Sequence, residues 1–292
     1  MAWTARLLTT GAAAAAVALA NAVPAQAAES PQRDGLLDSE SIGAVGDYDG
    51  DGVTDLFTTR MSNPDVMVSP YNLSVRKGRK DGSFGSPELL IRNWGTGWTA
   101  AADVNGDGRV DLLFRETDTS DLYLLPGQKD GSFGAKRLIT GGFDYNHIQV
   151  GDFNGDGKAD VVAMDNSWSA LYMWTGRADG TLSGPTKVAE GLLFTGTSAS
   201  DVNGDGVTDL IAHDAHRGDE LFLLAGNKNG GLDTPKVLLN NFSYQSTMAG
   251  DFNGDGKADI LATPLWRSGP MLLWKGNGDG TFSEPSQVTV DS

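Results

Sequence analysis

Short apolar runs bounded by Gly, Asp, Asn and Pro follow one another along most of the chain. Between residues 147 and 190, for example, they read HIQVG, DVVAM, LYMWTG and PTKVAE. Runs of this length between turn-forming residues are typical of β-strands. Beyond the first 27 residues, no stretch of 12 residues has the periodicity of an amphipathic helix, so the pattern predicts an all-β protein.

The runs belong to a unit that occurs five times. Each unit contains an aspartate-rich loop whose first residue is at position 47, 103, 152, 201 or 251, which gives spacings of 56, 49, 49 and 50 residues. A second motif, such as GQKDGSF, begins at Gly78, Gly127, Gly176, Gly226 and Gly276. The two motifs are 31 residues apart in the first unit and 24 or 25 apart in the others, so the first unit has about seven extra residues, within 60–72.

Four strands and two tight hairpins fit into each unit, which is the pattern of a β-propeller blade. We therefore expect a five-bladed propeller over residues 41–292, with blades at about 41–95, 96–144, 145–194, 195–244 and 245–292. A linear array of hairpins is the alternative, but it would leave two open edges on each sheet. The ring closes either by contact between a first strand near SIGAVG and a last strand near SQVTV, or by residues 28–40 adding an outer strand to the final blade.

The first 27 residues have the features of an export signal. Arg6 precedes an apolar, alanine-rich run, and Ala25-Gln26-Ala27 has the small-x-small pattern of a signal-peptidase site. We therefore expect residues 1–27 to be a signal peptide, residues 28–40 to be a linker or a closing strand, and the mature protein to be secreted. No later stretch approaches the roughly 20 apolar residues that a membrane-spanning helix needs.

The composition narrows the choice of partners. The chain has no cysteine, so outside the cell it would lack disulfides and would need another source of stability. Its net charge of −16 argues against nucleic acid and anionic membrane surfaces, both of which attract basic proteins. An acidic chain with repeated aspartates is instead suited to binding several cations.

The aspartate-rich loop has the chemistry of a calcium site. Numbered from its first aspartate, it has oxygen-bearing side chains at positions 1, 3, 5 and 9 and glycine at positions 4 and 6 in every copy. Position 7 varies, as expected where only the backbone carbonyl binds the ion. Glycine permits the tight path that turns several oxygens inward. The predicted ligands, with position 7 acting through its carbonyl, are Asp47, Asp49, Asp51, Val53, Asp55, Asp103, Asn105, Asp107, Arg109, Asp111, Asp152, Asn154, Asp156, Lys158, Asp160, Asp201, Asn203, Asp205, Val207, Asp209, Asp251, Asn253, Asp255, Lys257 and Asp259.

Other interpretations of the loop explain less. A type I′ hairpin turn would account for Asn-Gly or Asp-Gly but not for aspartates at positions 1, 5 and 9 in all five copies. Zinc would require His or Cys, and none of the three histidines is near a loop. Glycosidase catalysis requires two carboxyl groups in different environments, whereas equivalent clusters offer no such asymmetry. We therefore expect up to five structural Ca²⁺ sites.

The two motifs together, D-x-[DN]-x-D-G-x-x-D followed by G-x-x-x-D-G-x-F, resemble the FG-GAP (VCBS) repeats of integrin α-subunit-type propellers, in a form of the secreted bacterial type. The resemblance covers the chain from about residue 41 onward. It implies a propeller in which the loop joins the first and second strands of each blade and binds calcium through positions 1, 3, 5, 7 and 9. Integrin-type propellers have seven blades, whereas this sequence has five units. The repeat occurs in adhesins, lectins and polysaccharide-active proteins, so the resemblance does not identify a partner.

The connections on the face opposite the loops are rich in aromatic residues. Aromatic rings beside Asn, Asp and Arg suit sugar rings or protein contacts, although packing between blades is an alternative role for each of them. Trp174 and Trp274 are in the middle of strands, and we expect them in the core. The candidate ligand-binding residues are Trp94, Trp98, Tyr145, Trp168, Phe194, Tyr244 and Trp266.

These observations favour a non-catalytic binding or adhesion module for extracellular glycans or proteins. A polysaccharide lyase or glycoside hydrolase on a propeller scaffold is the alternative, and a structural matrix protein is a third possibility. An enzyme would need a polar cluster near the central axis, outside the repeat pattern. The candidates for it are Glu116, Asp118, Asp165, Asp214 and Arg267. The chain has no HExxH, GxSxG or cysteine nucleophile, so we assign no catalytic residue.

Overall fold

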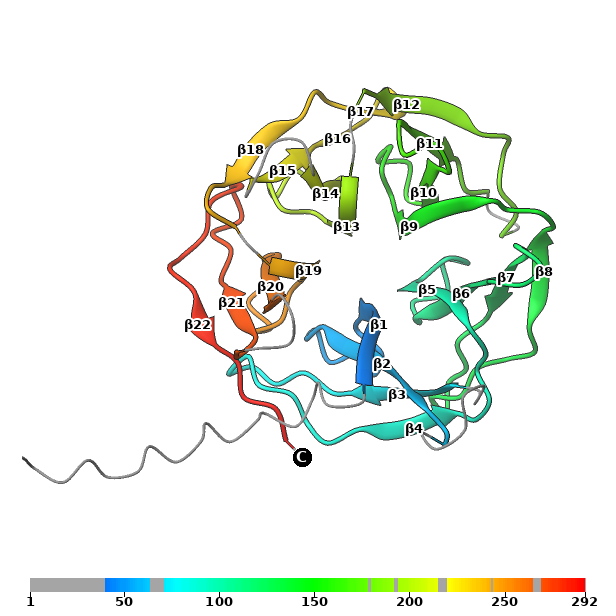
Figure 1. The fold of residues 1–292 in the computed structure, drawn as a ribbon, viewed down its shortest axis with the longest axis horizontal. Coiled ribbons are helices and arrows are strands. Elements are labelled where there is room, and N and C mark those ends of the chain that lie inside the picture. Colours follow the sequence, from blue (N-terminus) through cyan, green and yellow to red (C-terminus); the bar gives the residue numbers. More distant parts are fainter. Residues whose placement is uncertain are drawn as a thin grey trace, which may run out of the picture. The chain divides into compact units, whose positions relative to one another are not determined.

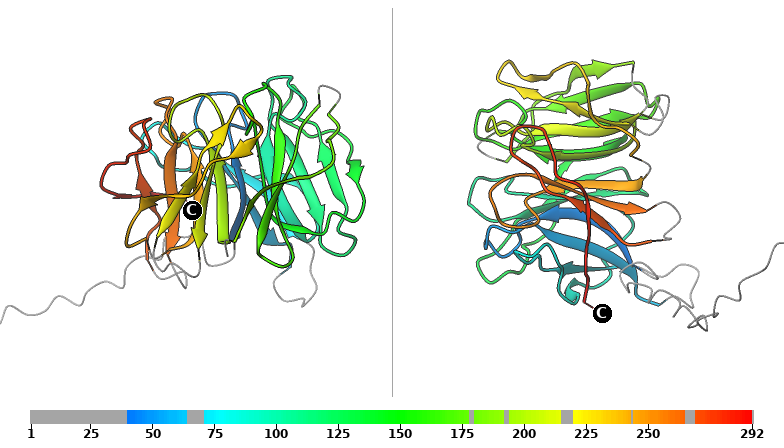
Figure 2. Two further views of the ribbon diagram at one scale, coloured as in Figure 1. Left: turned by 90° about the horizontal axis from the view of Figure 1, so that it is seen from above. Right: turned by 90° about the vertical axis from the view of Figure 1, so that its left-hand side faces the viewer.

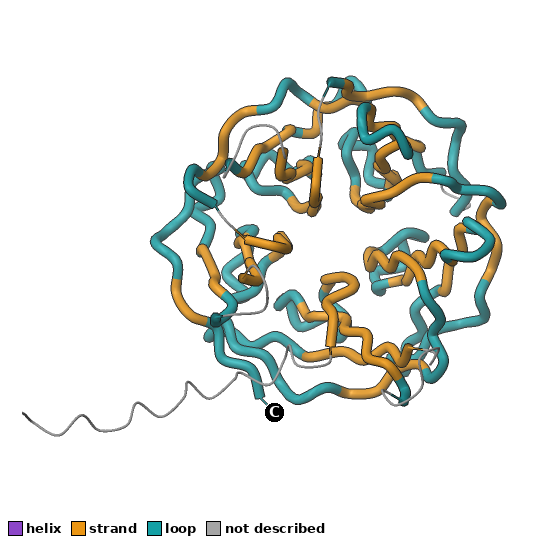
Figure 3. The backbone as a smooth tube through the Cα atoms, in the orientation of Figure 1, coloured by secondary structure: helices purple, strands orange, loops and turns teal. Residues whose placement is uncertain are grey.

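A computed structural model describes residues 40–63, 71–177, 180–191, 194–214, 220–242, 244–264 and 269–291. These residues form strands and loops without a helix, as Figure 3 shows, which confirms the prediction of an all-β fold. Within the described ranges there is accordingly no helix that could cross a membrane. The expected signal peptide, residues 1–27, lies outside the described residues.

The strands form five antiparallel sheets of four, each made from one continuous stretch of chain. Blade 1 contains β1 (Glu40–Gly46), β2 (Asp55–Met61), β3 (Tyr71–Arg76) and β4 (Glu88–Ile91). Blade 2 contains β5 (Gly97–Ala102), β6 (Asp111–Glu116), β7 (Leu122–Leu125) and β8 (Arg137–Thr140). Blade 3 contains β9 (Tyr145–Gly151), β10 (Asp160–Asp165), β11 (Ala170–Trp174) and β12 (Thr186–Glu190).

The last two blades have the same strand order. Blade 4 contains β13 (Phe194–Ser200), β14 (Asp209–Asp214), β15 (Leu221–Leu224) and β18 (Lys236–Leu239), with a small hairpin of β16 (Gly226–Asn227) and β17 (Gly231–Leu232). Blade 5 contains β19 (Tyr244–Gly250), β20 (Asp259–Pro264), β21 (Leu272–Trp274) and β22 (Ser286–Gln287). The blades surround a central axis, with β1, β5, β9, β13 and β19 innermost (Figure 1), and their strands run between two faces (Figure 2).

The core lies between the blades. Each of the five buried clusters combines residues from two neighbouring sheets, because both faces of every sheet are apolar. The cluster between blades 5 and 1 includes Leu56 and Phe84 from blade 1 and Phe252 and Leu261 from blade 5. The Phe84 and Phe252 rings pack edge to face with centroids 6.0 Å apart. A closed ring of blades, rather than a linear array, follows from this fifth interface.

The two ends of the described chain meet at blade 1. Residues after β22 cross to this blade, where the Phe84 N–H donates to the Thr289 carbonyl and the Asp291 N–H donates to the Phe84 carbonyl. Arg76, which is 2% exposed, pairs with Glu40 at 3.1 Å. The same guanidinium donates to the Asp291 carbonyl at 2.7 Å. The first and last blades therefore close side by side, and Glu40 begins the innermost strand of blade 1.

Neighbouring blades also fit together next to the aspartate-rich loops. The residue before position 1 of one blade faces position 8 of the next, and the N–H of Thr54 at position 8 donates to the Asp251 carbonyl of the neighbouring blade at 2.7 Å. A Cβ on Gly250 would lie 2.7 Å from Thr54 Oγ1, and one on Gly151 would lie 2.5 Å from Thr208 Cγ2. The five pairs, with the earlier blade first, are Gly46 and Val110, Ala102 and Ala159, Gly151 and Thr208, Ser200 and Ala258, and Gly250 and Thr54. Glycine therefore stands wherever position 8 carries Thr or Val.

Candidate metal loops and an aromatic site on the opposite face

Each aspartate-rich loop joins the first and second strands of its blade, and the aspartate at position 9 begins the second strand. This carboxylate is buried in all five copies. In blade 3, Asp160 accepts hydrogen bonds from the N–H groups of Phe153 at 3.1 Å and Gly176 at 2.9 Å. Gly176 begins the second motif, so position 9 ties the two motifs together. The same bond joins position 9 to the corresponding glycine in the other four blades.

The glycine of the second motif is required by this close approach. A Cβ on Gly176 would lie 2.0 Å from the Ala159 carbonyl oxygen, and one on Gly78 would lie 2.5 Å from the Thr54 carbonyl oxygen. Real Cβ atoms do not approach backbone oxygens so closely. The fixed offset between the two motifs thus has a physical reason, because both belong to one buried hydrogen-bond network.

Burial perturbs the position-9 carboxyl groups. It raises the pKa of Asp55 to about 7, and the nearby Asp49 and Asp47 carboxylates add to the increase. The same cause raises the pKa of three other position-9 carboxyl groups to about 6, namely Asp160, Asp209 and Asp259. Burial also raises the pKa of Asp111. A buried carboxylate with other carboxylates beside it is an environment that a cation would stabilise.

The loop backbone wraps around the carboxylate at position 1. Asp47 accepts hydrogen bonds from the N–H groups of Gly50, Asp51 and Gly52 at 2.8, 3.1 and 3.0 Å. Gly50 and Gly52 have φ values of 75° and 85°, which glycine adopts without strain. The glycines at positions 4 and 6 therefore shape the loop as the sequence indicates.

Positions 3 and 7 differ among the copies, whereas position 5 is always Asp. In the first loop, oxygens of Asp47, Asp49 and Asp55 lie within 4.8 Å of one another. In the other loops position 3 is Asn, whose side-chain amide donates to the position-9 carboxylate. The position-5 carboxylate accepts the N–H of position 7, as Asp156 does from Lys158, and Lys158 Nζ also lies 3.0 Å from Asp156.

The side chain at position 7 is not free in every copy, contrary to the interpretation that only its carbonyl matters. Val53 and Val207 are buried. A Cβ on Gly254 of the neighbouring blade would lie 3.0 Å from Val53, and one on Gly155 would lie 3.2 Å from Val207. Valine at position 7 thus packs against the adjacent loop, whereas Arg109 and Lys158 pair with position 5 of their own loop.

The donor set of the loops suits calcium. Its side chains offer only oxygen, and Ca²⁺ prefers carboxylate, amide and carbonyl oxygens in flexible geometry. The first loop brings three carboxylates together, and the other four offer two aspartates and an asparagine at positions 1, 9 and 3. The hydrogen bonds described above occupy part of each carboxylate, since each oxygen has two lone pairs.

An aromatic row lies on the face opposite the loops, between blades 2 and 3. Trp98 is near the start of β5, and Trp168 is in the connection between β10 and β11. His147 lies between them, with ring centroids 5.2 Å from each. The two indoles are 38% and 39% exposed, whereas His147 is 7% exposed. His147 belongs to the FDYNH segment, but the sequence alone did not distinguish it from its neighbours.

The backbone of this row is unusual. Trp168 has a φ of 59°, and His147 has a φ of 50°. Histidine tolerates the left-handed region better than most residues, but a bulky tryptophan there is an outlier. The turn is held by Asp165, whose carbonyl accepts the Trp168 N–H at 3.0 Å and whose carboxylate accepts the Ser169 N–H at 3.1 Å. Asp165, a candidate for catalysis, therefore has a structural role in presenting Trp168.

The other predicted ligand-binding residues lie elsewhere. Trp94 is 8% exposed and its indole N–H donates to Thr99 Oγ1, so it belongs to the interior, contrary to expectation. Tyr145 packs against Trp174, and Tyr244 packs against Trp274, so both are partners of core tryptophans. Trp174 and Trp274 are buried as predicted. The Phe194 side chain and Trp266 lie outside the described residues.

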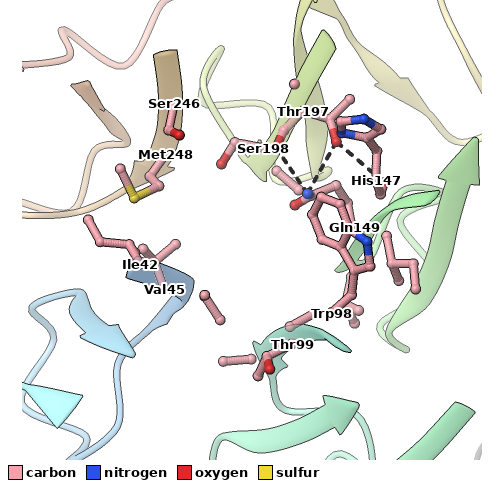
Figure 4. A pocket seen from close by; sticks show the side chains of 18 of the residues that line it. Ile42, Val45, Trp98, Thr99, His147, Gln149, Thr197, Ser198, Ser246 and Met248 are labelled. Carbon is pink, nitrogen blue, oxygen red and sulfur yellow. Dashed lines mark hydrogen bonds between the residues drawn. The ribbon is translucent and has the colours of Figure 1, made fainter. Parts of the chain in front are cut away.

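Two residues of the aromatic row, Trp98 and His147, border a cavity of about 210 Å³ on the central axis. Side chains from the innermost strands of all five blades surround it (Figure 4). Trp98 and His147 contribute to its wall, and none of the described residues that line it is Asp, Glu, Lys or Arg. Glu116, a candidate for a catalytic cluster, pairs with Lys136 at 3.1 Å. Among the described residues, the group of three acidic side chains close enough to share a metal ion is the one in the first loop. The Asp214 side chain and Arg267 are not described.

Fold and loops together define a β-propeller built from one repeated blade. The FG-GAP-like repeat family matches residues 47–114, 103–163, 152–212, 201–262 and 251–292, and the chain belongs to this family. The propeller has five blades, which differs from the seven of the integrin type. A comparison with curated proteins gave no match.

Several solved structures are similar in fold. An Agrocybe aegerita lectin that recognises non-reducing terminal N-acetylglucosamine is 16% identical, with a TM-score of 0.50 over 85% of this chain and 80% of the lectin. The RS223 β-xylosidase is 12% identical, with a TM-score of 0.56 over 86% of this chain and 97% of the xylosidase. A Photorhabdus luminescens Tc holotoxin pore matches with a TM-score of 0.47 and 15% identity, over 85% of this chain and 12% of the toxin chain. At these identities the likeness concerns the fold alone.

Proposed function

We propose that the protein is a secreted, calcium-stabilised propeller that binds an extracellular glycan without catalysis, on the face opposite the loops. The observation that carries this proposal is the pair of partly exposed tryptophans, Trp98 and Trp168, that flank His147, with Trp98 and His147 lining the axial cavity. Sugar rings stack their apolar faces on aromatic side chains and form hydrogen bonds at their edges. An extracellular protein that presents an aromatic side chain is the other kind of partner that such a surface suits.

Two further observations support binding rather than catalysis. The described lining of the cavity lacks carboxylates and bases other than His147, so it offers no pair of acids for glycoside hydrolysis. Blade 3 also holds Trp168 at a φ of 59°, although its side chain remains 39% exposed. Residues held in such conformations cluster at functional sites. The fold itself is compatible with glycan binding, since the Agrocybe lectin shares it.

In this proposal calcium stabilises the ring instead of taking part in binding. Extracellular calcium modules bind with dissociation constants of roughly 0.1–1 mM. One site with a Kd of about 0.1 mM gains roughly 1.4 kcal/mol in about 1 mM Ca²⁺. Five such sites would contribute about 7 kcal/mol, which is comparable with the net stability of a domain. Calcium would thus replace the disulfides that a chain without cysteine cannot form.

A glycan array probed with the purified protein tests the proposed function. We expect binding to a subset of glycans, with loss of signal in Trp98→Ala and Trp168→Ala. Leu138→Ala is the matched control, because Leu138 is 54% exposed on the outer strand β8, away from the axis. An array without any signal, or turnover of a bound polysaccharide, would contradict the proposal. N-terminal sequencing of the exported protein should begin at Ala28 if the signal peptide is correct.

A further inference from the structure

The His147 side chain is mostly buried, and it lines the axial cavity. It is 7% exposed, and its contacts are the two tryptophan rings that flank it. Among the described residues, the imidazole nitrogens form no hydrogen bond, although the His147 carbonyl accepts one from Thr197. The imidazole nitrogens are not fully buried, since among the described residues the fully buried side-chain polar atom without a partner is Thr58 Oγ1. The ring lines the axial cavity, so a bound molecule could supply the missing partner.

The surroundings of His147 indicate a neutral ligand. Gln149 and Thr197, which are joined by a hydrogen bond of 3.0 Å, lie on the same side of the cavity (Figure 4). Burial lowers the pKa of His147, so its imidazole is neutral near pH 7. The carboxylate of Asp165 is outside the cavity lining, at the base of the Trp168 turn, and that of Asp144 pairs with Arg115 at 3.5 Å. Nothing in the described wall compensates the charge of an anionic ligand, and the chain as a whole has a net charge of −16.

The two tryptophans limit the shape of the ligand. Both rings lie 5.2 Å from the imidazole, and both retain more than a third of their surface exposed. A molecule that hydrogen-bonds to the imidazole is therefore close enough to contact an indole ring. A ring with an apolar face and hydroxyl groups at its edge satisfies both requirements, because it stacks on indole and hydrogen-bonds to imidazole.

We propose that the mouth of the axial cavity receives a neutral, hydroxyl-rich sugar residue, which hydrogen-bonds to His147 while it stacks on Trp98 and Trp168. This inference rests on the proposed function and extends it to a class of ligand and to a residue that determines specificity. Uronic acids and sulfated sugars are excluded from the site, because a buried anion without a counter-charge is unfavourable.

Isothermal titration calorimetry on the full-length mature protein with calcium tests the ligand class. The neutral probes are cellotriose, xylotriose and chitotriose, and the anionic probe is trigalacturonate. We expect at least one neutral probe to bind, with loss of binding in Trp98→Ala, and no binding of trigalacturonate. Equal, Trp98-dependent binding of trigalacturonate would overturn the neutral class but would leave the proposed function intact. If no glycan is bound on the array or in the calorimeter, the proposed function fails and this inference fails with it.

Two substitutions test the role of His147. His147→Phe keeps a flanked aromatic ring but removes both nitrogens, and we expect about a tenfold loss of affinity, the upper range for one hydrogen bond. His147→Asn restores a polar group and tolerates a positive φ, so it should recover part of the affinity. Melting temperatures within about 2 °C of the wild type show that the fold is intact. Wild-type affinity in His147→Phe, or equal losses in both variants, would overturn the assignment.

Discussion

The two faces of the propeller differ in how closely the blades repeat one another. On the loop face, five copies repeat one arrangement, in which a buried aspartate at position 9 joins two motifs. On the opposite face, the connections differ in sequence from blade to blade, and the aromatic row of Trp98, His147 and Trp168 lies between blades 2 and 3. The arrangement around the position-9 aspartate, which all five blades share, holds the ring together. The aromatic row between blades 2 and 3 is the surface that we propose for a ligand.

Removal of calcium should cause the largest loss of stability, because we expect the loop face to hold the ring together. We expect EDTA to lower the free energy of unfolding by up to about 7 kcal/mol if all five loops are loaded. Differential scanning calorimetry with and without about 1 mM Ca²⁺ measures the change, and the same pair of conditions can be applied to Leu138→Ala as a control. An unchanged melting temperature in EDTA would show that the loops are hydrogen-bonded turns that need no ion.

Loss of one position-9 aspartate should have the second-largest effect on stability. Asp160→Ala leaves the N–H groups of Phe153 and Gly176 buried without their partner, which costs about 4 kcal/mol, roughly 2 for each group. For a chain of this size, the melting temperature should fall by roughly 10 °C. Asp156→Ala in the same loop removes an exposed position-5 carboxylate, and in EDTA it should have little effect. Equal losses in the two variants would mean that position 9 is not the structural centre of the loop.

The fit between neighbouring blades can be tested at the junction of the last blade with the first. Gly250→Ala forces a methyl group against Thr54 and should destabilise the protein by about 2 kcal/mol, as overpacking does. Thr54→Ala makes room, so the double variant should recover most of the loss. Chemical denaturation of the four proteins gives the coupling energy. Additive effects would argue against the contact between these two residues.

The pH dependence of the metal-free protein should reveal the buried carboxyl groups. The pKa of Asp55 is raised to about 7 and that of Asp160 to about 6 in the folded state, against an ordinary value of 3.8. The folded state therefore binds protons more tightly than the unfolded state between about pH 4 and 7, and stability in EDTA should increase as the pH falls through this window. These two groups alone should give an increase of about 4 kcal/mol between pH 7.5 and 5. With calcium the trend should weaken or reverse, because protons compete with the ion.

The smallest effect on stability is expected for a substitution of Trp168, which should change stability and glycan binding in opposite directions. Trp168→Gly removes a bulky side chain from a φ of 59°, so it should stabilise the fold by about 1 kcal/mol while it abolishes glycan binding. The thermal shift and the array signal of one variant then move in opposite directions. A destabilised Trp168→Gly variant would instead indicate that the indole contributes to packing.

Repetition explains why the fold could be predicted from the sequence. Five copies of one motif fix the strand positions and the blade count, and the buried runs of the second and third strands are present in every copy. The role of position 9 was less accessible. Sequence alone marks it as an oxygen donor at the start of a strand, but its bond to a glycine 16 or 17 residues later, as in Asp160 and Asp209, follows only from the pairing of the strands.

The ligand face could be predicted only in part, because an aromatic residue at a loop tip has the same appearance whether it points inward or outward. Trp94 and Trp98 lie four residues apart, yet the first is buried against Phe114 and the second borders the cavity. His147 became distinguishable only through its burial between two indoles. Composition and motif spacing do not show which aromatic side chains are buried, because this burial depends on contacts between different blades.

The pairing of large and small residues between blades also alternates along the ring. Blades 2 and 4 carry Val at position 2 of the loop and Val or Thr at position 8, whereas blades 3 and 5 carry Phe and Ala at these positions. The residues before the loop alternate in step, with Ala or Ser in blades 2 and 4 and Gly in blades 3 and 5. From blade 2 to blade 5, a blade with one set of residues therefore always follows a blade with the other set. Blades 3 and 5, which share the nine letters DFNGDGKAD, present the same loop residues to their neighbours.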